Sequence, residues 1–130
     1  MAAFSLTSTS IKMVSGGNTI SVTAAETIAA GQAVTVDGYV VDAQDSDKLT
    51  VAGSAIQNAT TGGVAVLAPP GSVIGFSDTL TFPRTILADS GGQLQYESDL
   101  TSGDAIVRVG LSITANQIRV EAENTGYSKS

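Results

Sequence analysis

The acidic side chains are the groups in this sequence whose type and spacing could support chemistry. Seven of the twelve form three short groups, which are Asp42, Asp45 and Asp47, then Glu97 and Asp99, and then Glu121 and Glu123. Residues two apart on a strand share a face, so either pair could supply the two carboxyls that glycoside hydrolysis needs. The hard oxygens of the first group could bind Ca²⁺.

Both uses lack their supporting residues. Sugar-binding clefts are lined with aromatic side chains, whereas this sequence has no Trp, three Tyr and three Phe. The EF-hand calcium loop needs a Gly and a distant Glu in fixed register, and the segment 42–47 provides neither. We therefore predict that 42–47 is a solvated acidic loop, and that the chain has no metal site and no cofactor.

Nucleophilic catalysis lacks its components as well. The sequence has no His, the commonest general base, and no Cys, which excludes thiolate chemistry, disulfides and Cys/His zinc sites. No Ser lies in a Gly-x-Ser-x-Gly pattern, and neither Lys48 nor Lys129 is flanked by an apolar run that would lower its pKa. We predict no catalytic residues and a protein that is not an enzyme.

The charge pattern excludes other partners. The net charge is −6 with a pI of about 4.2, and the six basic residues are scattered, so neither nucleic acid nor an anionic membrane is an expected partner. No apolar run approaches the ~20 residues of a membrane helix, and the N-terminus lacks the pattern of a signal peptide.

Charged residues make up only 14% of the chain, against about 25% in ordinary soluble domains. Such a surface is suited to being covered by neighbouring proteins.

The elements that would position these side chains are short strands. Asp37-Gly38 lies between two β-branched runs and predicts a hairpin with a type I′ turn. Strands at 49–53 and 64–67 follow, and a Gly-rich turn precedes the second. Further hairpins are predicted for 11–14 with 19–23, for 85–88 with 93–96, and for 105–113 with 117–121. Between them, Thr23 to Glu26 has the spacing of a capping box, for which we expect at most one helical turn.

This pattern predicts an all-β fold, either an antiparallel β-sandwich or a small β-barrel of jelly-roll type. We divide the chain into an N-terminal arm at 1–10, a single β domain at 11–123 and a loose polar tail at 124–130.

Four apolar side chains are candidate contacts with a partner. In the arm, Phe4 and Leu6 alternate with Ser and Thr, which suits either an extended segment that adds to a neighbour's sheet edge or a frayed terminus. Leu80 and Phe82 alternate in a segment that Pro83 restricts to a sheet edge.

The glycine turns and alternating valines of 28–38, 51–55 and 61–66 resemble those of the small capsid decoration, or cement, proteins of tailed bacteriophages. The segment 94–116 is similar to the closing segment of phage head and fibre proteins, with the pattern x-G-D-x-[IV]-x-x-V-G-x-A-[LI]-[ST]. Ser112 departs from it, because a small apolar residue is more usual there.

The resemblance implies a protein that binds the outside of an assembled icosahedral head and clamps adjacent major capsid protein subunits. It further implies a homotrimer that is made in the host cytoplasm and resides on the exterior of the virion, without catalytic residues. Two alternatives stay open. One is another phage structural module, such as a head fibre base or a tail or baseplate β domain. The other is a carbohydrate- or cell-surface-binding module, which the scarcity of aromatic residues disfavours.

Overall fold

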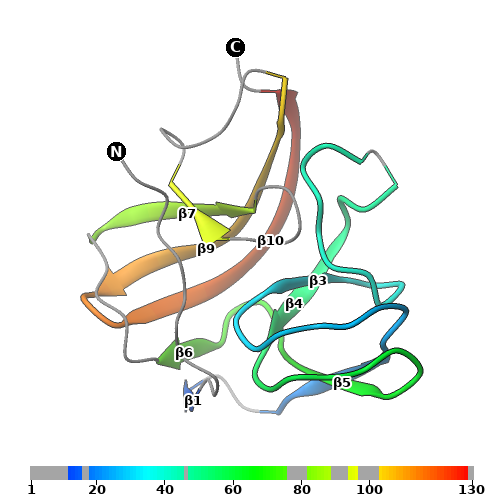
Figure 1. Ribbon diagram of the computed structural model, residues 1–130. Coiled ribbons are helices and arrows are strands. Elements are labelled where there is room, and N and C mark those ends of the chain that lie inside the picture. The colour runs from blue at the N-terminus through cyan, green and yellow to red at the C-terminus, as the bar shows by residue number, and fades with distance from the viewer. Residues whose placement is uncertain are drawn as a thin grey trace.

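The computed structural model describes residues 12–15, 18–45, 47–75, 82–88, 94–96 and 103–128. All regular elements in these ranges are strands, and they form two antiparallel sheets, one of six strands and one of four (Figure 1). The predicted all-β fold with a sandwich of antiparallel sheets is confirmed. The predicted arm at 1–10 lies outside the described residues.

The larger sheet has the strand order β1-β6-β10-β9-β7-β8. Its strands are β1 (Lys12–Ser15), β6 (Val73–Gly75), β10 (Gln117–Ser128), β9 (Ala105–Thr114), β7 (Arg84–Ala88) and β8 (Leu94–Gln95). The pairing of β7 with β8 and of β9 with β10 confirms the two hairpins that were predicted in this half of the chain.

The smaller sheet has the order β2-β5-β4-β3. Its strands are β2 (Ile20–Thr23), β5 (Val64–Ala68), β4 (Val51–Ala55) and β3 (Ala33–Thr35). After β3 the chain reverses as predicted, and Val34 bridges Val40.

The type of this reversal differs from the prediction, because a type I′ turn needs positive φ at two residues and only Gly38 has it, at 88°. The N–H of Gly38 donates to the carbonyl of Thr35 (3.1 Å), and the N–H of Thr35 donates to the carbonyl of Tyr39 (2.7 Å). These bonds define a three-residue loop that closes on a glycine bulge.

The predicted first hairpin is wrong. β1 pairs with β6 in the larger sheet, and β2 pairs with β5 in the smaller one, so the segment between them crosses from sheet to sheet. Each strand finds a distant partner whose pairing outweighs the local turn signal.

From Thr23 to Glu26, where at most one helical turn was expected and otherwise a connection, no helical turn forms and the chain runs on as a connection. The N–H of Ala24 donates to the carbonyl of Gly63 (2.8 Å). Further along, the Glu26 carboxylate accepts from the N–H of Val40 (3.1 Å) instead of capping a helix.

The predicted loose tail is wrong for residues 124–128, which belong to β10. Asn124 pairs with Val107, Ser128 pairs with Ala105, and the Thr125 hydroxyl donates to the carbonyl of Ile106 (2.7 Å). The polar side chains do not oppose this pairing, because a strand ladder is built from backbone groups.

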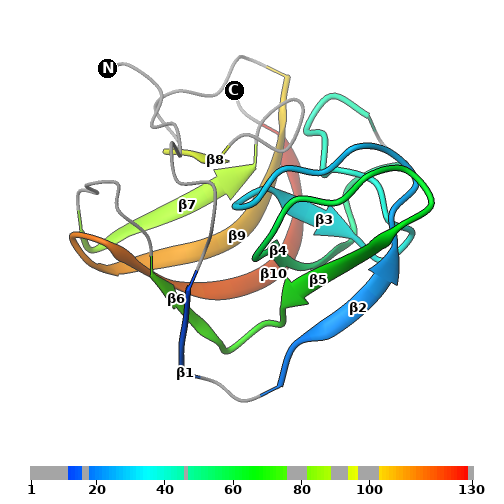
Figure 2. The same ribbon diagram turned by 60° about the horizontal axis from the view of Figure 1, so that its bottom comes forward.

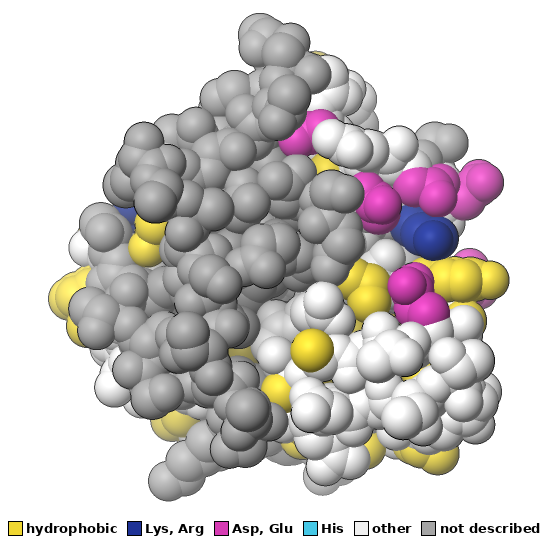
Figure 3. Space-filling model, in the orientation of Figure 1, with side chains coloured by type: hydrophobic (Ala, Val, Ile, Leu, Met, Phe, Trp, Pro, Cys, Tyr) yellow, Lys and Arg dark blue, Asp and Glu magenta, His cyan; other side chains and the backbone are white. Residues whose placement is uncertain are grey.

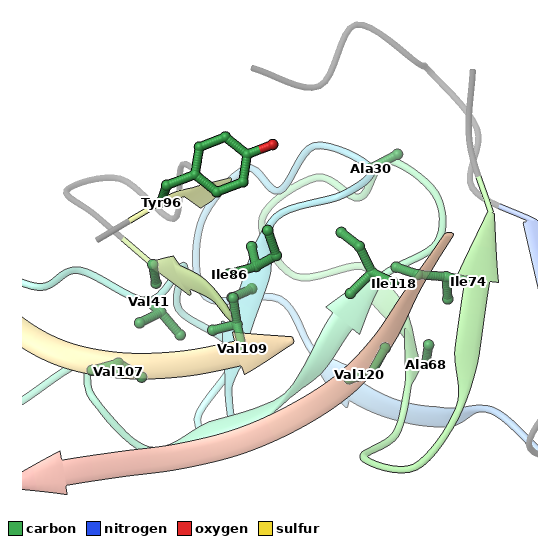
Figure 4. Packing of buried hydrophobic residues seen from close by; sticks show 12 residues of the cluster. Ala30, Val41, Ala68, Ile74, Ile86, Tyr96, Val107, Val109, Ile118 and Val120 are labelled. Atoms are coloured by element: carbon green, nitrogen blue, oxygen red, sulfur yellow. The ribbon is translucent and has the colours of Figure 1, made fainter. Parts of the chain in front are cut away.

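Two apolar cores lie on opposite faces of the smaller sheet. The first core lies between the sheets (Figure 4) and contains Ala30, Ala33, Val41, Ala68, Ile74, Ile86, Ala88, Tyr96, Val107, Val109, Ile118 and Val120. The second core contains Ala24, Ile28, Val34, Val40, Ala52, Ala55, Ala59, Ala65 and Leu67, several of which come from loops that cover the sheet. Because both of its faces carry buried side chains, the smaller sheet is a rigid element.

Candidate interaction surface

The predicted acidic loop is held by its own turns. One oxygen of Asp42 accepts from the N–H of Gln44 (2.9 Å), and one oxygen of Asp45 accepts from the N–H of Asp47 (2.9 Å). Such side-chain to backbone bonds are typical of Asx turns. The two carboxylates therefore have a local structural role in the loop.

Lys48 neutralises part of this loop. Its Nζ lies 3.9 Å from a carboxylate oxygen of Asp45 and 3.9 Å from one of Glu26, and 4.8 Å from the ring centroid of Tyr39. Figure 3 shows acidic side chains gathered around a basic one on this part of the surface. Within the described ranges, no three carboxylates lie close enough together to hold a metal ion.

The predicted pair Glu121 and Glu123 shares the guanidinium of Arg108, and Glu121 also lies 3.6 Å from Arg119 Nη2. Arg108 Nη2 lies 3.1 Å from Glu121 Oε1, and Arg108 Nη1 lies 3.2 Å from Glu123 Oε1. An irregularity in the β9–β10 register between Val120 and Glu123 accompanies this arrangement. A cavity of about 390 Å³ lies beside it, lined by Pro70, Gly71, Arg108, Arg119, Val120, Glu121, Ala122 and Glu123. Both carboxylates are thus part of an ion-pair cluster. The other predicted pair, Glu97 and Asp99, lies outside the described residues.

Large apolar side chains are exposed at several places in the described chain. They are Val14, Ile20, Val36, Tyr39, Val64, Phe82, Ile113 and Tyr127. Two of them, Phe82 and Ile113, lie at the end of the larger sheet where β9 turns into β10, and we call these two the hairpin-end patch.

The pairing register of the strands shows where the patch lies in the larger sheet. One row of paired residues crosses the larger sheet, namely Met13, Ile74, Ile118, Ser112 and Arg84. Ile113 follows this row on β9 and Phe82 precedes it before β7, so both lie toward the β9–β10 turn. Val14 is not part of the patch, because it lies between Met13 and Ser15 on the edge strand β1, on the other side of this row.

One of the four predicted contact residues is in the patch. Phe82 is 52% exposed, as expected for a contact residue before a partner binds. Phe4, Leu6 and Leu80 lie outside the described residues. The sequence analysis missed Ile113, which lies in an apolar strand and follows the buried Ser112, where the β9–β10 register is irregular.

No protein-family model matches this chain, and no curated protein matches it. The resemblance to capsid decoration proteins therefore stays a prediction. No described segment forms a helix that is long and apolar enough to cross a membrane.

Proposed function

We propose that this chain is a non-enzymatic structural protein that binds the outer surface of an assembled phage head and cements adjacent major capsid protein subunits. The hairpin-end patch is the observation that carries this proposal. It presents two large apolar side chains, those of Phe82 and Ile113, at one end of a sandwich with two packed cores. Exposed apolar groups that gather in one place are typical of protein interaction sites. The resemblance of the glycine turns indicates the kind of assembly.

The charge distribution supports an exterior position. A net charge of −6 gives no attraction to packaged DNA, and the described carboxylates at 42–47 and 121–123 are occupied by turns and ion pairs. A surface with few charges loses little solvation energy when neighbouring subunits cover it.

The physical role follows from mass action. Packaged DNA pushes capsid subunits apart, and a protein that binds only the expanded lattice stabilises that state by its binding free energy. Many copies on one head add their contributions. A rigid body is suited to this role, because little binding energy is lost in ordering it.

We also propose a homotrimer at three-fold or quasi-three-fold positions of the head. Three copies around such an axis can each present one patch to a different capsid subunit. The low charged fraction of the chain supports close packing of these copies, since like charges oppose each other less often.

Re-addition to expanded heads that lack the protein tests this function. Purified wild-type chain is added to the heads, and bound copies are counted by quantitative mass spectrometry. We expect saturation at hundreds of copies per particle. The double variant F82S/I113S should bind at least about tenfold more weakly, since it loses apolar burial worth more than about 1.4 kcal/mol.

The matched control is V36S, because Val36 is 53% exposed but lies in the β3 hairpin loop, away from the patch. It should bind like the wild type. Absence of wild-type binding, or a handful of copies per particle, would overturn the proposed function. Equal binding by F82S/I113S and V36S would remove the patch as the contact.

A further inference from the structure

The edges of the two sheets differ in how they are protected against pairing with another chain. β1 carries Lys12 and a register irregularity at Val14, and β8 has only two residues. β3 is covered by its own hairpin return, where the N–H of Val41 donates to the carbonyl of Ala33 (2.9 Å). Bulges, charges, short strands and covering segments are the usual means of blocking an edge.

Within the described part of the chain, β2 has none of these devices along its first half. Its four residues pair with β5 in an uninterrupted register, from Ile20 with Leu67 to Thr23 with Val64. It is the last strand of the smaller sheet, and Figure 2 shows it at the margin of the molecule. A regular, exposed strand of this kind is a template for a further strand.

Hydrogen bonds around β2 show which backbone groups face outward. The N–H of Ala24 donates to the carbonyl of Gly63 on the β5 side (2.8 Å). Because successive residues of a strand alternate in direction, Val22 and Ile20 also bond toward β5, whereas Ser21 and Thr19 point away from it.

The second half of this edge is covered by the hairpin loop after β3. The carbonyl oxygen of Thr23 lies so close to Gly38 that a Cβ there would be 2.0 Å from it, and the N–H of Ala25 donates to the carbonyl of Gly38 (2.9 Å). The open part of the edge is therefore the backbone of Thr19 and Ser21, on either side of Ile20.

The charges near this edge indicate which kind of chain can pair with it. In a two-fold contact the residues at the axis lie close to their own copies, so a charged residue there would face a like charge. Residues 18–25 contain no ionisable side chain. Two copies with a net charge of −6 each can therefore meet at this edge without placing like charges opposite one another, whereas the edge strand β1 carries Lys12.

We propose that β2 of one copy pairs antiparallel with β2 of a second copy, about a two-fold axis at Ile20. In this register Thr19 of each copy is opposite Ser21 of the other, so the outward backbone groups bond in pairs. The two Ile20 side chains, each 37% exposed, meet on the same face of the joined sheets. This contact goes beyond head binding, and it would join copies of neighbouring trimers.

Cysteine cross-linking tests the pair, because the chain has no Cys of its own. We expect I20C to form a covalent dimer under mild oxidation at least about tenfold faster than I113C, since directly opposed residues of an antiparallel pair lie within disulfide reach. Ile113 is the matched control at 36% exposure. Equal rates for the two variants would overturn the proposal.

A second comparison uses Ser21. S21P removes an outward N–H that β5 does not use, whereas S21A keeps it. In sedimentation experiments without phage particles, wild type and S21A should have at least twice the mass of S21P, whether the basic unit is one chain or three. A folded S21P with the wild-type mass would overturn the pairing. If S21P does not fold, the cross-linking rates decide, and neither result depends on head binding.

Discussion

Ser112 and Arg84 are joined across two strands by a pair of hydrogen bonds. The buried hydroxyl of Ser112 accepts from the backbone N–H of Arg84 (2.9 Å) and donates to its carbonyl (3.2 Å). This contact fixes the start of β7 on β9, directly after Pro83, which has no N–H to contribute. The Arg84 guanidinium lies 4.1 Å from the ring centroid of Tyr96 at the same end of the sheet. The residue that departs from the phage pattern is thus a polar link between strands.

Replacing Ser112 with Ala should lower the free energy of unfolding by about 1–3 kcal/mol, because the substitution removes both bonds and leaves buried polar groups without this partner. Urea denaturation measures the change. S128A serves as the control, since Ser128 is exposed at the end of β10 and its substitution should have an effect within about 0.5 kcal/mol. A neutral S112A would show that these bonds do not stabilise the fold.

Two glycines with the same backbone conformation should respond differently to Ala. Gly38 and Gly62 have φ values of 88° and 83°, but a Cβ on Gly38 would lie 2.0 Å from the Thr23 carbonyl, whereas a Cβ on Gly62 has open space. G62A should cost only the backbone strain of about 1–2 kcal/mol. G38A must also displace the loop from β2, so its midpoint of thermal unfolding should fall well below that of G62A. Equal midpoints would contradict the close approach.

The ion pairs of Arg108 should contribute little to stability. Arg108 and Glu123 are both substantially exposed, and solvent screens such pairs. E123Q should therefore change the free energy of unfolding by less than about 1 kcal/mol, and the difference should shrink in high salt. Denaturation at low and high ionic strength checks this. A larger loss that persists in salt would indicate that the cluster is a structural element of the β9–β10 pair.

Deletion of residues 1–8 should abolish attachment to heads and leave the midpoint of thermal unfolding nearly unchanged. The reason is the alternation of Phe4 and Leu6 with hydroxyl residues, which suits an arm that binds a neighbour's sheet edge. Head binding and a thermal melt of the truncated chain check the two parts. Retained attachment would remove the arm as a contact, while F82S/I113S tests the patch separately.

The hairpins at 33–41, 84–95 and 105–121 could be predicted from sequence because their signals are local. Glycine turns and alternating apolar residues act over a few positions, and the partner strand follows at once in the chain. The same reasoning correctly described 42–47 as a loop, because Asp42 and Asp45 bond to backbone groups two residues away.

Only the tertiary structure decided the parts that depend on distant partners. β1 and β2 look like a hairpin in sequence, yet pairing with β6 and β5 separates them into two sheets. Pairing with the backbone of β9 extends β10 through the polar residues 124–128, where the sequence has no alternating apolar pattern that would predict a strand. The exposure of Val14 and Ile113 depends on strand register, and the open edge at Ile20 depends on strand order. Register and order are both set by which strands pair in the folded protein.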